Sequence, residues 1–264
     1  MQALHQLSAQ VCRKIQYVFC DIDDTLTLDG RLLEESYSAL WRAHRSGYKL
    51  IPITGRPAGW VDQIARLWPV DAVVGENGGF YAWMSPTGLK TRYIQDEETR
   101  RQNRVRLDHL QAQILKQIPG TALASDQSFR HLDLAIDFCE DVPPLPQSSV
   151  QHIVQLFEQA GAAAKVSSIH VNGWFGDHDK LTTCQLLAQE QLGLDAETLR
   201  EHSIFCGDSP NDEPMFRWFP HSIGVANVNH FLAQMQYHPA YVTPSEGGLG
   251  FAELIEHLCT NASH

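Results

Sequence analysis

A short stretch near the start of the chain, Val18 to Thr27, constrains the fold most strongly. Its sequence is Val-Phe-Cys-Asp-Ile-Asp-Asp-Thr-Leu-Thr, so an apolar run ends in three carboxylates within four residues. Such a run is typical of a strand buried on both faces of a parallel sheet. Carboxylates at its exit repel one another and resist burial, so we expect a cation, most naturally a divalent metal, to compensate them. Taken alone, an acidic turn explains the same residues, because Asp favours turns.

Three further segments have the same form, an apolar strand followed by a polar or Gly-containing turn. They are Leu50 to Arg56, Gly176 to Lys180 and Ile204 to Asp212. Apolar residues recur at helical spacing between several of the predicted strands, as in Arg31 to Ser46. Strands that alternate with helices in this way predict a parallel sheet with crossover helices.

The pattern changes in the middle of the chain. Residues 81–96 form a hairpin-like pattern, and long helical patterns follow over Glu97 to Ile118 and Ser148 to Ala160. Strands are predicted over Phe129 to Phe138 and, in two pieces, over Ala164 to Phe175. We therefore expect a core formed by residues 1–82 and 177–264, with a separate α+β lobe, residues 83–176, inserted into it.

Charge and composition limit the partners. A net charge of −11 argues against nucleic acid or an anionic membrane as the main partner. No apolar run approaches the length of a membrane span, and the six cysteines are scattered without a paired motif. These features predict a soluble cytoplasmic protein.

The four loop segments together resemble the motif set of the haloacid dehalogenase superfamily. The matching residues, in chain order, are Asp21, Asp23 and Thr25, then Thr54, then Lys180, then Gly207, Asp208 and Asp212. The resemblance covers both ends of the chain. It implies an α/β fold, a Rossmann-like parallel-sheet core with strand order 3-2-1-4-5, and an inserted α+β cap domain.

The resemblance also implies a Mg²⁺ site. Its expected ligands are the carboxylates of Asp21 and Asp208 and the backbone carbonyl of Asp23. Asn211 and Asp212 are expected to hold metal-bound waters or to orient Lys180. The alternative for Asp212 is an acidic helix start, which interacts favourably with the helix dipole.

By the same resemblance, Asp21 is the nucleophile that forms an aspartyl-phosphate, and Asp23 protonates the leaving oxygen. Thr54 and the backbone N–H of Gly55 are expected to bind the phosphoryl oxygens, while Lys180 offsets the negative charge. The structural alternatives are a helix-capping Thr, a turn Gly and a solvated Lys.

Other residues are expected to bind substrate. Arg56 either reaches a substrate phosphate or only solvates a loop. Glu76-Asn77-Gly78-Gly79 resembles a turn of the type IIB branch, which carries a large cap, and Asn77 is assigned there to phosphate binding. In the cap, Ser168, His170 and Asn172 share one strand face by period two, and this face either meets sugar hydroxyls or is simply half-solvated.

The type IIB branch includes Cof-like hydrolases and the sucrose-phosphate, trehalose-phosphate and mannosyl-phosphoglycerate phosphatases. The resemblance thus implies a Mg²⁺-dependent phosphomonoester hydrolase acting on a small phosphorylated metabolite, most naturally a sugar phosphate. The alternatives are a phosphomutase of the same superfamily and a catalytically silent binding protein.

Overall fold

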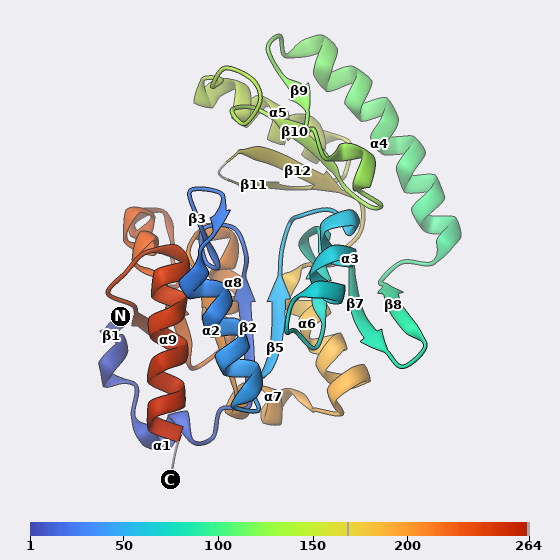
Figure 1. Ribbon diagram of the computed structural model, residues 1–264. Coiled ribbons are helices and arrows are strands. Elements are labelled where there is room, and N and C mark those ends of the chain that lie inside the picture. The colour runs from blue at the N-terminus through green and yellow to red at the C-terminus, as the bar shows by residue number, and fades with distance from the viewer. Residues whose placement is uncertain (168, 263–264) are drawn as a thin grey trace.

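The computed structural model describes residues 1–167 and 169–262. A large α/β core occupies one end of the molecule, and a smaller α+β cap lies over one edge of the core sheet (Figure 1).

In the described residues, the core contains a nine-stranded sheet with strand order β1-β15-β14-β13-β2-β5-β6-β7-β8. Neighbouring strands are parallel from β1 to β6, and β7 and β8 join antiparallel. The strands are β1 (Gln2–Ala3), β2 (Tyr17–Asp21), β5 (Lys49–Ile53), β6 (Val73–Gly75), β7 (Phe80–Ser85), β8 (Gly88–Tyr93), β13 (Ser203–Gly207), β14 (Ser222–Gly224) and β15 (Tyr241–Val242). The order β6-β5-β2-β13-β14 confirms the predicted 3-2-1-4-5 arrangement.

Both faces of this sheet are covered, which explains the continuous apolar character of β2. Val18 and Cys20 pack into one apolar cluster, whereas Phe19 between them packs into a second cluster on the opposite face. All three side chains are fully buried, and each large apolar side chain buried in this way contributes about 1.5–3 kcal/mol to stability.

The core helices divide between these two clusters. The first cluster contains residues of α1 (Ala9–Cys12), α2 (Glu34–Arg45), α3 (Ala58–Leu67) and α9 (Gly247–Ala262). The second contains residues of α6 (Lys180–Leu187), α7 (Ala196–His202) and α8 (Glu213–Trp218). The core is therefore a three-layer structure, with the sheet between two layers of helices.

The cap is built on an antiparallel four-stranded sheet of order β11-β12-β10-β9. Its elements are α4 (Glu97–Gln117), β9 (Ala122–Leu123), β10 (Leu134–Asp137), α5 (Gln147–Gln159), β11 (Ala163–Val166) and β12 (His170–Trp174). Leu134 and Ile136 point into an apolar cluster with residues of α4 and α5. By period two, Ala135 and Asp137 belong to the opposite sheet face, and Figure 1 shows the sheet between the cap helices and the core.

The hairpin of β7 and β8 pairs with the core sheet, with Ser85 opposite Gly88 at its turn. The expected boundary at residue 83 therefore falls inside a core strand, and we propose that the cap begins after β8.

The predicted strand from Phe129 to Phe138 is wrong over its first half. A short 3₁₀ helix, η3 (Gln127–Phe129), and an irregular segment precede β10, which starts at Leu134. A buried carboxylate from the core binds the backbone of this irregular segment, as described below. No helix in the described ranges is long and apolar enough to cross a membrane.

Candidate active site

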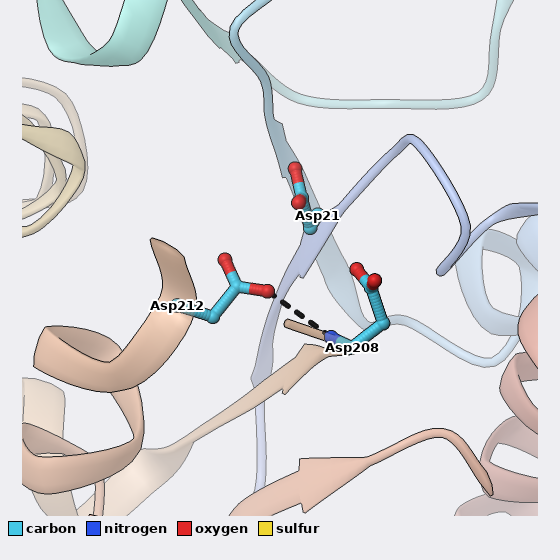
Figure 2. A group of neighbouring side chains, drawn as sticks. All are labelled: Asp21, Asp208 and Asp212. Atoms are coloured by element: carbon cyan, nitrogen blue, oxygen red, sulfur yellow. Dashed lines mark hydrogen bonds between the residues drawn. The ribbon is translucent and has the colours of Figure 1, made fainter. Parts of the chain in front are cut away.

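The acidic loops converge because β2 and β13 are neighbouring parallel strands. Cys20 pairs with Cys206 in the register, so Asp21 and Asp208 emerge close together at the carboxyl ends of these strands. Asp212 lies in the short helix η5 (Pro210–Asp212) that follows. One carboxylate oxygen from each of the three lies within 4.8 Å of the others, and all three side chains are buried (Figure 2).

This cluster is short of positive charge. Burial raises the pKa of Asp21 to about 7, with Asp212 and Asp23 adding to the rise and Lys180 opposing it. Burial, followed by the charges of Asp212 and Asp21, likewise raises the pKa of Asp208 well above its usual value. Asp21 and Asp208 therefore resist ionisation in the absence of a further cation.

Lys180 supplies one compensating charge. Its Nζ lies 3.1 Å from Oδ2 of Asp21 and 3.0 Å from Oδ1 of Asp212, and it donates a longer hydrogen bond of 3.4 Å to Asn211 Oδ1. Burial lowers the pKa of Lys180, but the two carboxylates outweigh burial and raise it above its usual value. Lys180 is the first residue of α6, where a cation opposes the helix dipole, so its position is explained by these anionic partners. Asp179 caps the same helix and accepts from Thr182 N–H at 2.7 Å.

The donor set fits a divalent cation. It offers buried carboxylate oxygens and no thiolate, as suits Mg²⁺ or Ca²⁺, and its negative charge exceeds what Lys180 neutralises. Among the described residues, nothing donates to Asp208 Oδ2, whereas Thr25 Oγ1 donates to Oδ1 at 2.9 Å. Asp21 accepts from the Ile22 N–H through Oδ1 and lies beside Lys180 through Oδ2. Both oxygens of Asp212 already accept, one from Lys180 and the other from the Asp208 N–H at 3.1 Å. Asp212 thus contacts both the Lys180 ammonium and the backbone of Asp208.

The side chain of Asp23 contacts two residues that follow β5, Thr54 and Arg56. Arg56 binds it through two nitrogens, with Nε 3.0 Å and Nη2 2.8 Å from Oδ1. Thr54 Oγ1 lies 3.5 Å from Oδ2 of Asp23 and also accepts from the Arg56 N–H at 2.9 Å. In this structure Arg56 therefore pairs with Asp23 rather than solvating a loop.

Gly55 and Asn77 form a tight contact beside Thr54. A Cβ added to Gly55 would lie 3.1 Å from Asn77 Oδ1, so the glycine allows this close approach. Asn77 has a left-handed backbone with φ 55°, and its N–H donates to the Thr54 carbonyl at 3.1 Å. Its buried Nδ2 has no hydrogen-bond partner among the described residues, which leaves a donor available for a ligand.

The cap residues predicted to share a face are not half-solvated. His170 and Asn172 are both buried at 3% and 5% exposure. Asn172 Nδ2 donates to Asp133 Oδ2 at 3.0 Å, and His170 Nε2 lies 2.8 Å from Oε2 of Glu140. Their burial follows from the position of the cap sheet, whose polar face is directed at the core. Ser168 lies outside the described residues.

Glu76 joins the core to the cap, a role that the sequence pattern did not suggest. This fully buried carboxylate accepts from the N–H groups of His131, Leu132 and Asp133, at 2.6–3.1 Å, and from the Ala58 N–H at 3.0 Å. The hydrogen bonds explain why residues before Leu134 leave the strand conformation.

Arg130, which sequence analysis placed in a strand, crosses from the cap to the core. It donates to the Gly55 carbonyl at 2.9 Å and pairs with Asp126 and Asp133 at 3.0 Å each. The sequence signal that could have revealed these ion pairs is spacing, because Asp126 precedes Arg130 by four residues and Asp133 follows it by three.

Residues 18–110 match the family model described as haloacid dehalogenase-like hydrolase. A search of curated proteins finds no match.

Three solved structures share the fold across nearly the whole chain. A Thermoplasma acidophilum protein superposes with a TM-score of 0.71 at 17% identity, covering 92% of this chain and 98% of that one. The sucrose-phosphatase of Synechocystis sp., solved with sucrose and phosphate, gives 0.63 at 21% identity, covering 93% and 98%. The C-terminal domain of C. albicans trehalose-6-phosphate phosphatase gives 0.72 at 12% identity, covering 99% of each chain. Residues 18–110 thus match the family of haloacid dehalogenase-like hydrolases, and nearly the whole chain shares the fold of these three structures.

Proposed function

We propose that this protein is a Mg²⁺-dependent phosphatase of small phosphomonoesters, most naturally sugar phosphates, and that it acts through an aspartyl-phosphate. The observation that carries the proposal is the convergence of Asp21, Asp208 and Asp212 around Lys180, with Asp23 beside them. The two phosphatases of similar fold, named for sucrose and for trehalose-6-phosphate, support a sugar phosphate as the substrate class.

Asp21 is the proposed nucleophile. Its Oδ1 accepts from the Ile22 N–H at 2.9 Å, and Lys180 lies beside its Oδ2, so the carboxylate is held in one orientation. Attack on phosphorus forms an acyl phosphate and breaks the bond to the leaving oxygen; water then hydrolyses this intermediate. Each of these two steps has a lower activation barrier than one direct displacement by water.

Asp23 is the proposed general acid and base. Protonated, it gives its proton to the leaving oxygen, and it then takes a proton from the attacking water. Arg56 and Thr54 fix its position from the neighbouring strand.

The transferring phosphoryl group needs donors on its other oxygens. We assign these to Thr54, the Gly55 N–H and the unpartnered Nδ2 of Asn77. Asn211 is assigned to orienting Lys180, through their 3.4 Å hydrogen bond.

Asp21 and Asp208, with the backbone carbonyl of Asp23, are the residues proposed to hold Mg²⁺. The bound ion supplies electrostatic compensation of the nucleophile and the phosphoryl oxygens, which otherwise repel each other.

Phosphate release from p-nitrophenyl phosphate and a panel of sugar phosphates, with Mg²⁺ and with EDTA, tests the proposal. We expect release only with Mg²⁺. Asp21→Asn should lower kcat by at least about a thousandfold because the nucleophile is lost. Asp29→Asn is the matched control: Asp29 is an exposed carboxylate in the turn between β3 (Thr27–Leu28) and β4 (Arg31–Leu32), with φ 49°, a backbone that Asn adopts readily.

Mg²⁺ binding gives a second readout. Mg²⁺ at about one hundred times its Kd should stabilise the wild type by about 2.7 kcal/mol, and Asp208→Asn should lose most of this gain. Undiminished phosphatase activity in Asp21→Asn would refute the mechanism, and isomerised product without free phosphate would refute the reaction class.

A further inference from the structure

The core and the cap meet at a group of charged side chains beside Asp23, here called the seam cluster: Asp23, Arg56, Asp126, Arg130, Asp133, Glu140 and His170. Arg56 is its centre. Its guanidinium lies 2.8 Å from Asp23, 3.9 Å from Asp126 and 4.0 Å from Glu140. One core carboxylate and two cap carboxylates thus surround a single cation.

The seam cluster is acidic. Its four carboxylates face two guanidiniums, which leaves an excess of two negative charges. Arg130 is buried and already pairs with Asp126 and Asp133, while Arg56 pairs with Asp23. His170 adds no compensating charge, because burial lowers its pKa although Glu140 opposes that shift. Neither guanidinium is therefore free to bind a further anion.

Two carboxylates of the cluster remain open to solvent. The side chains of Asp23 and Glu140 are 36% and 33% exposed, whereas those of Asp126 and Arg56 are 12% and 15% exposed. Asp23 and Glu140 both contact Arg56, so in the proposed reaction a leaving group attached to the oxygen that Asp23 protonates would lie near both carboxylates. The phosphoryl group would then lie toward Lys180 and Asp21.

The loop that carries Glu140 is held in place. Asp137, fully buried at the end of β10, accepts from the N–H groups of Cys139, Glu140 and Asp141 at 2.7–2.9 Å. His170 lies on the neighbouring strand β12, and its Nε2 is 2.8 Å from Oε2 of Glu140. Glu140 is therefore held in a defined position at the seam cluster. A residue that discriminates between substrates must be held in this way.

We propose that Glu140 is a specificity-determining residue that favours an uncharged polyhydroxy leaving group and rejects one with a second anionic group; this rests on the proposed function. Hydroxyl groups donate to a carboxylate, so a neutral sugar gains hydrogen bonds from the exposed oxygen of Glu140. A carboxylate or second phosphate on the leaving group meets the like charges of Asp23 and Glu140, and both guanidiniums of the seam cluster are already paired. Affinity for the neutral sugar and rejection of the anion then come from the same side chain.

The test uses glucose 6-phosphate, whose sugar is uncharged, and 6-phosphogluconate, an open-chain sugar acid that carries an additional carboxylate. Each competes with p-nitrophenyl phosphate, so its apparent affinity is obtained whether or not it is turned over. In the wild type we expect glucose 6-phosphate to compete at least about tenfold better. Glu140→Gln should reduce this preference to less than about threefold, mainly by improving competition from 6-phosphogluconate.

Glu158→Gln is the matched control, because Glu158 is an exposed carboxylate of the cap helix α5, and its preference should equal the wild type. Salt provides a measurement that needs no variant. Raising KCl from about 50 mM to about 500 mM shortens the electrostatic screening length. The preference of the wild type for glucose 6-phosphate over 6-phosphogluconate should therefore decrease. Thermal unfolding shows whether Glu140→Gln is folded.

Three results would overturn the proposal, provided that p-nitrophenyl phosphate is still hydrolysed. These are equal competition by the two compounds, no competition by either, and a preference that stays the same in Glu140→Gln and at high salt. Failure of the wild type to hydrolyse p-nitrophenyl phosphate with Mg²⁺ would instead refute the proposed function, and this inference with it.

Discussion

Lys180 places one ammonium between two buried carboxylates, Asp21 and Asp212. Removing one member of a buried ion pair leaves an uncompensated charge, and this costs far more than an exposed pair is worth. The site therefore depends on Lys180 for stability as well as for the proposed chemistry.

Lys180→Met should lower the free energy of unfolding by about 3–5 kcal/mol in metal-free buffer. The double variant Lys180→Met, Asp212→Asn should lose less than the sum of the two single losses, because the neutral amide no longer needs the cation. Urea unfolding with EDTA measures all four proteins. Additive losses would show that Lys180 and Asp212 are not coupled.

The pairing of Arg56 with Asp23 is a contact of the site that could not be predicted from the sequence, unlike the convergence of the acidic residues. Asp21, Asp208 and Lys180 were predicted to converge from the resemblance of the loop segments to the haloacid dehalogenase motif set. The partner of Arg56 was not predictable, since Asp23 lies 33 residues away and only the β2–β5 register brings the two together.

At the scale of elements, the turn η2 (Glu76–Gly78) packs against the start of α6. Gly78 has φ 101°, and an added Cβ would overlap the carbonyl oxygen of Asp179, the residue before Lys180. Thr183 Oγ1 also donates to the Gly78 carbonyl at 2.6 Å. The position of Lys180 thus depends on a glycine in a distant turn.

Gly78→Ala should cost more than about 3 kcal/mol of stability, because the strained backbone is joined by a steric overlap, and it should lower kcat by displacing Lys180. Gly88→Ala is a matched control: Gly88 has φ 107°, but nothing lies within 4 Å of an added Cβ. The control should lose about 1–2 kcal/mol from backbone strain alone and keep its kcat. Thermal unfolding and p-nitrophenyl phosphate hydrolysis measure both, and equal losses in the two variants would contradict this explanation.

The core elements were predictable from local pattern, whereas the cap was only partly so. The runs ending at Asp21 and Asp208 are continuous and apolar, and a strand buried on both faces requires that composition. In the cap, the predicted strand from Phe129 is wrong over its first half, because the N–H groups of His131 and Leu132 donate to the Glu76 carboxylate instead of to a neighbouring strand. Period two placed His170 and Asn172 on one face correctly, but periodicity does not state what covers a face.

At the scale of the whole molecule, Glu76 ties the cap to the core through three consecutive backbone N–H groups of the cap. In Glu76→Gln, the amide NH₂ faces donors and at least one bond is lost, so stability should fall by about 1–3 kcal/mol.

Amide exchange at residues 131–133 should also accelerate in Glu76→Gln, which hydrogen-exchange mass spectrometry detects. Glu158→Gln should exchange like the wild type at these residues. Unchanged exchange at 131–133 in Glu76→Gln would show that other contacts hold the cap loop.

His178 lies where the chain returns from the cap to the core, stacked on Trp174. Its two ring nitrogens are buried and have no hydrogen-bond partner among the described residues. Burial lowers its pKa, although Asp133, Asp179 and Asp177 oppose the shift. The unfolded chain therefore binds a proton more readily, so the contribution of His178 is fully present above about pH 6.5 and is lost as the pH falls below that value.

His178→Phe keeps an aromatic ring on Trp174 and removes the titration. The melting temperature of this variant should fall less steeply than that of the wild type between about pH 6.5 and pH 5. His109→Gln, an exposed position on α4, should keep the wild-type slope. A slope unchanged in His178→Phe would assign the acid sensitivity to other groups.

The pairing of β2 with β13 also has a consequence for how the protein is made. Thr25 and its partner Asp208 are 183 positions apart, and the whole cap lies between them in the chain. During synthesis, β2 must therefore wait for most of the polypeptide to emerge before its neighbour on that side is available, and contacts of such long range slow folding. A nascent chain that already carries Asp21 still lacks both Lys180 and Asp208. The charge balance of the site therefore cannot be completed until the chain has been synthesised beyond the cap and past Asp208.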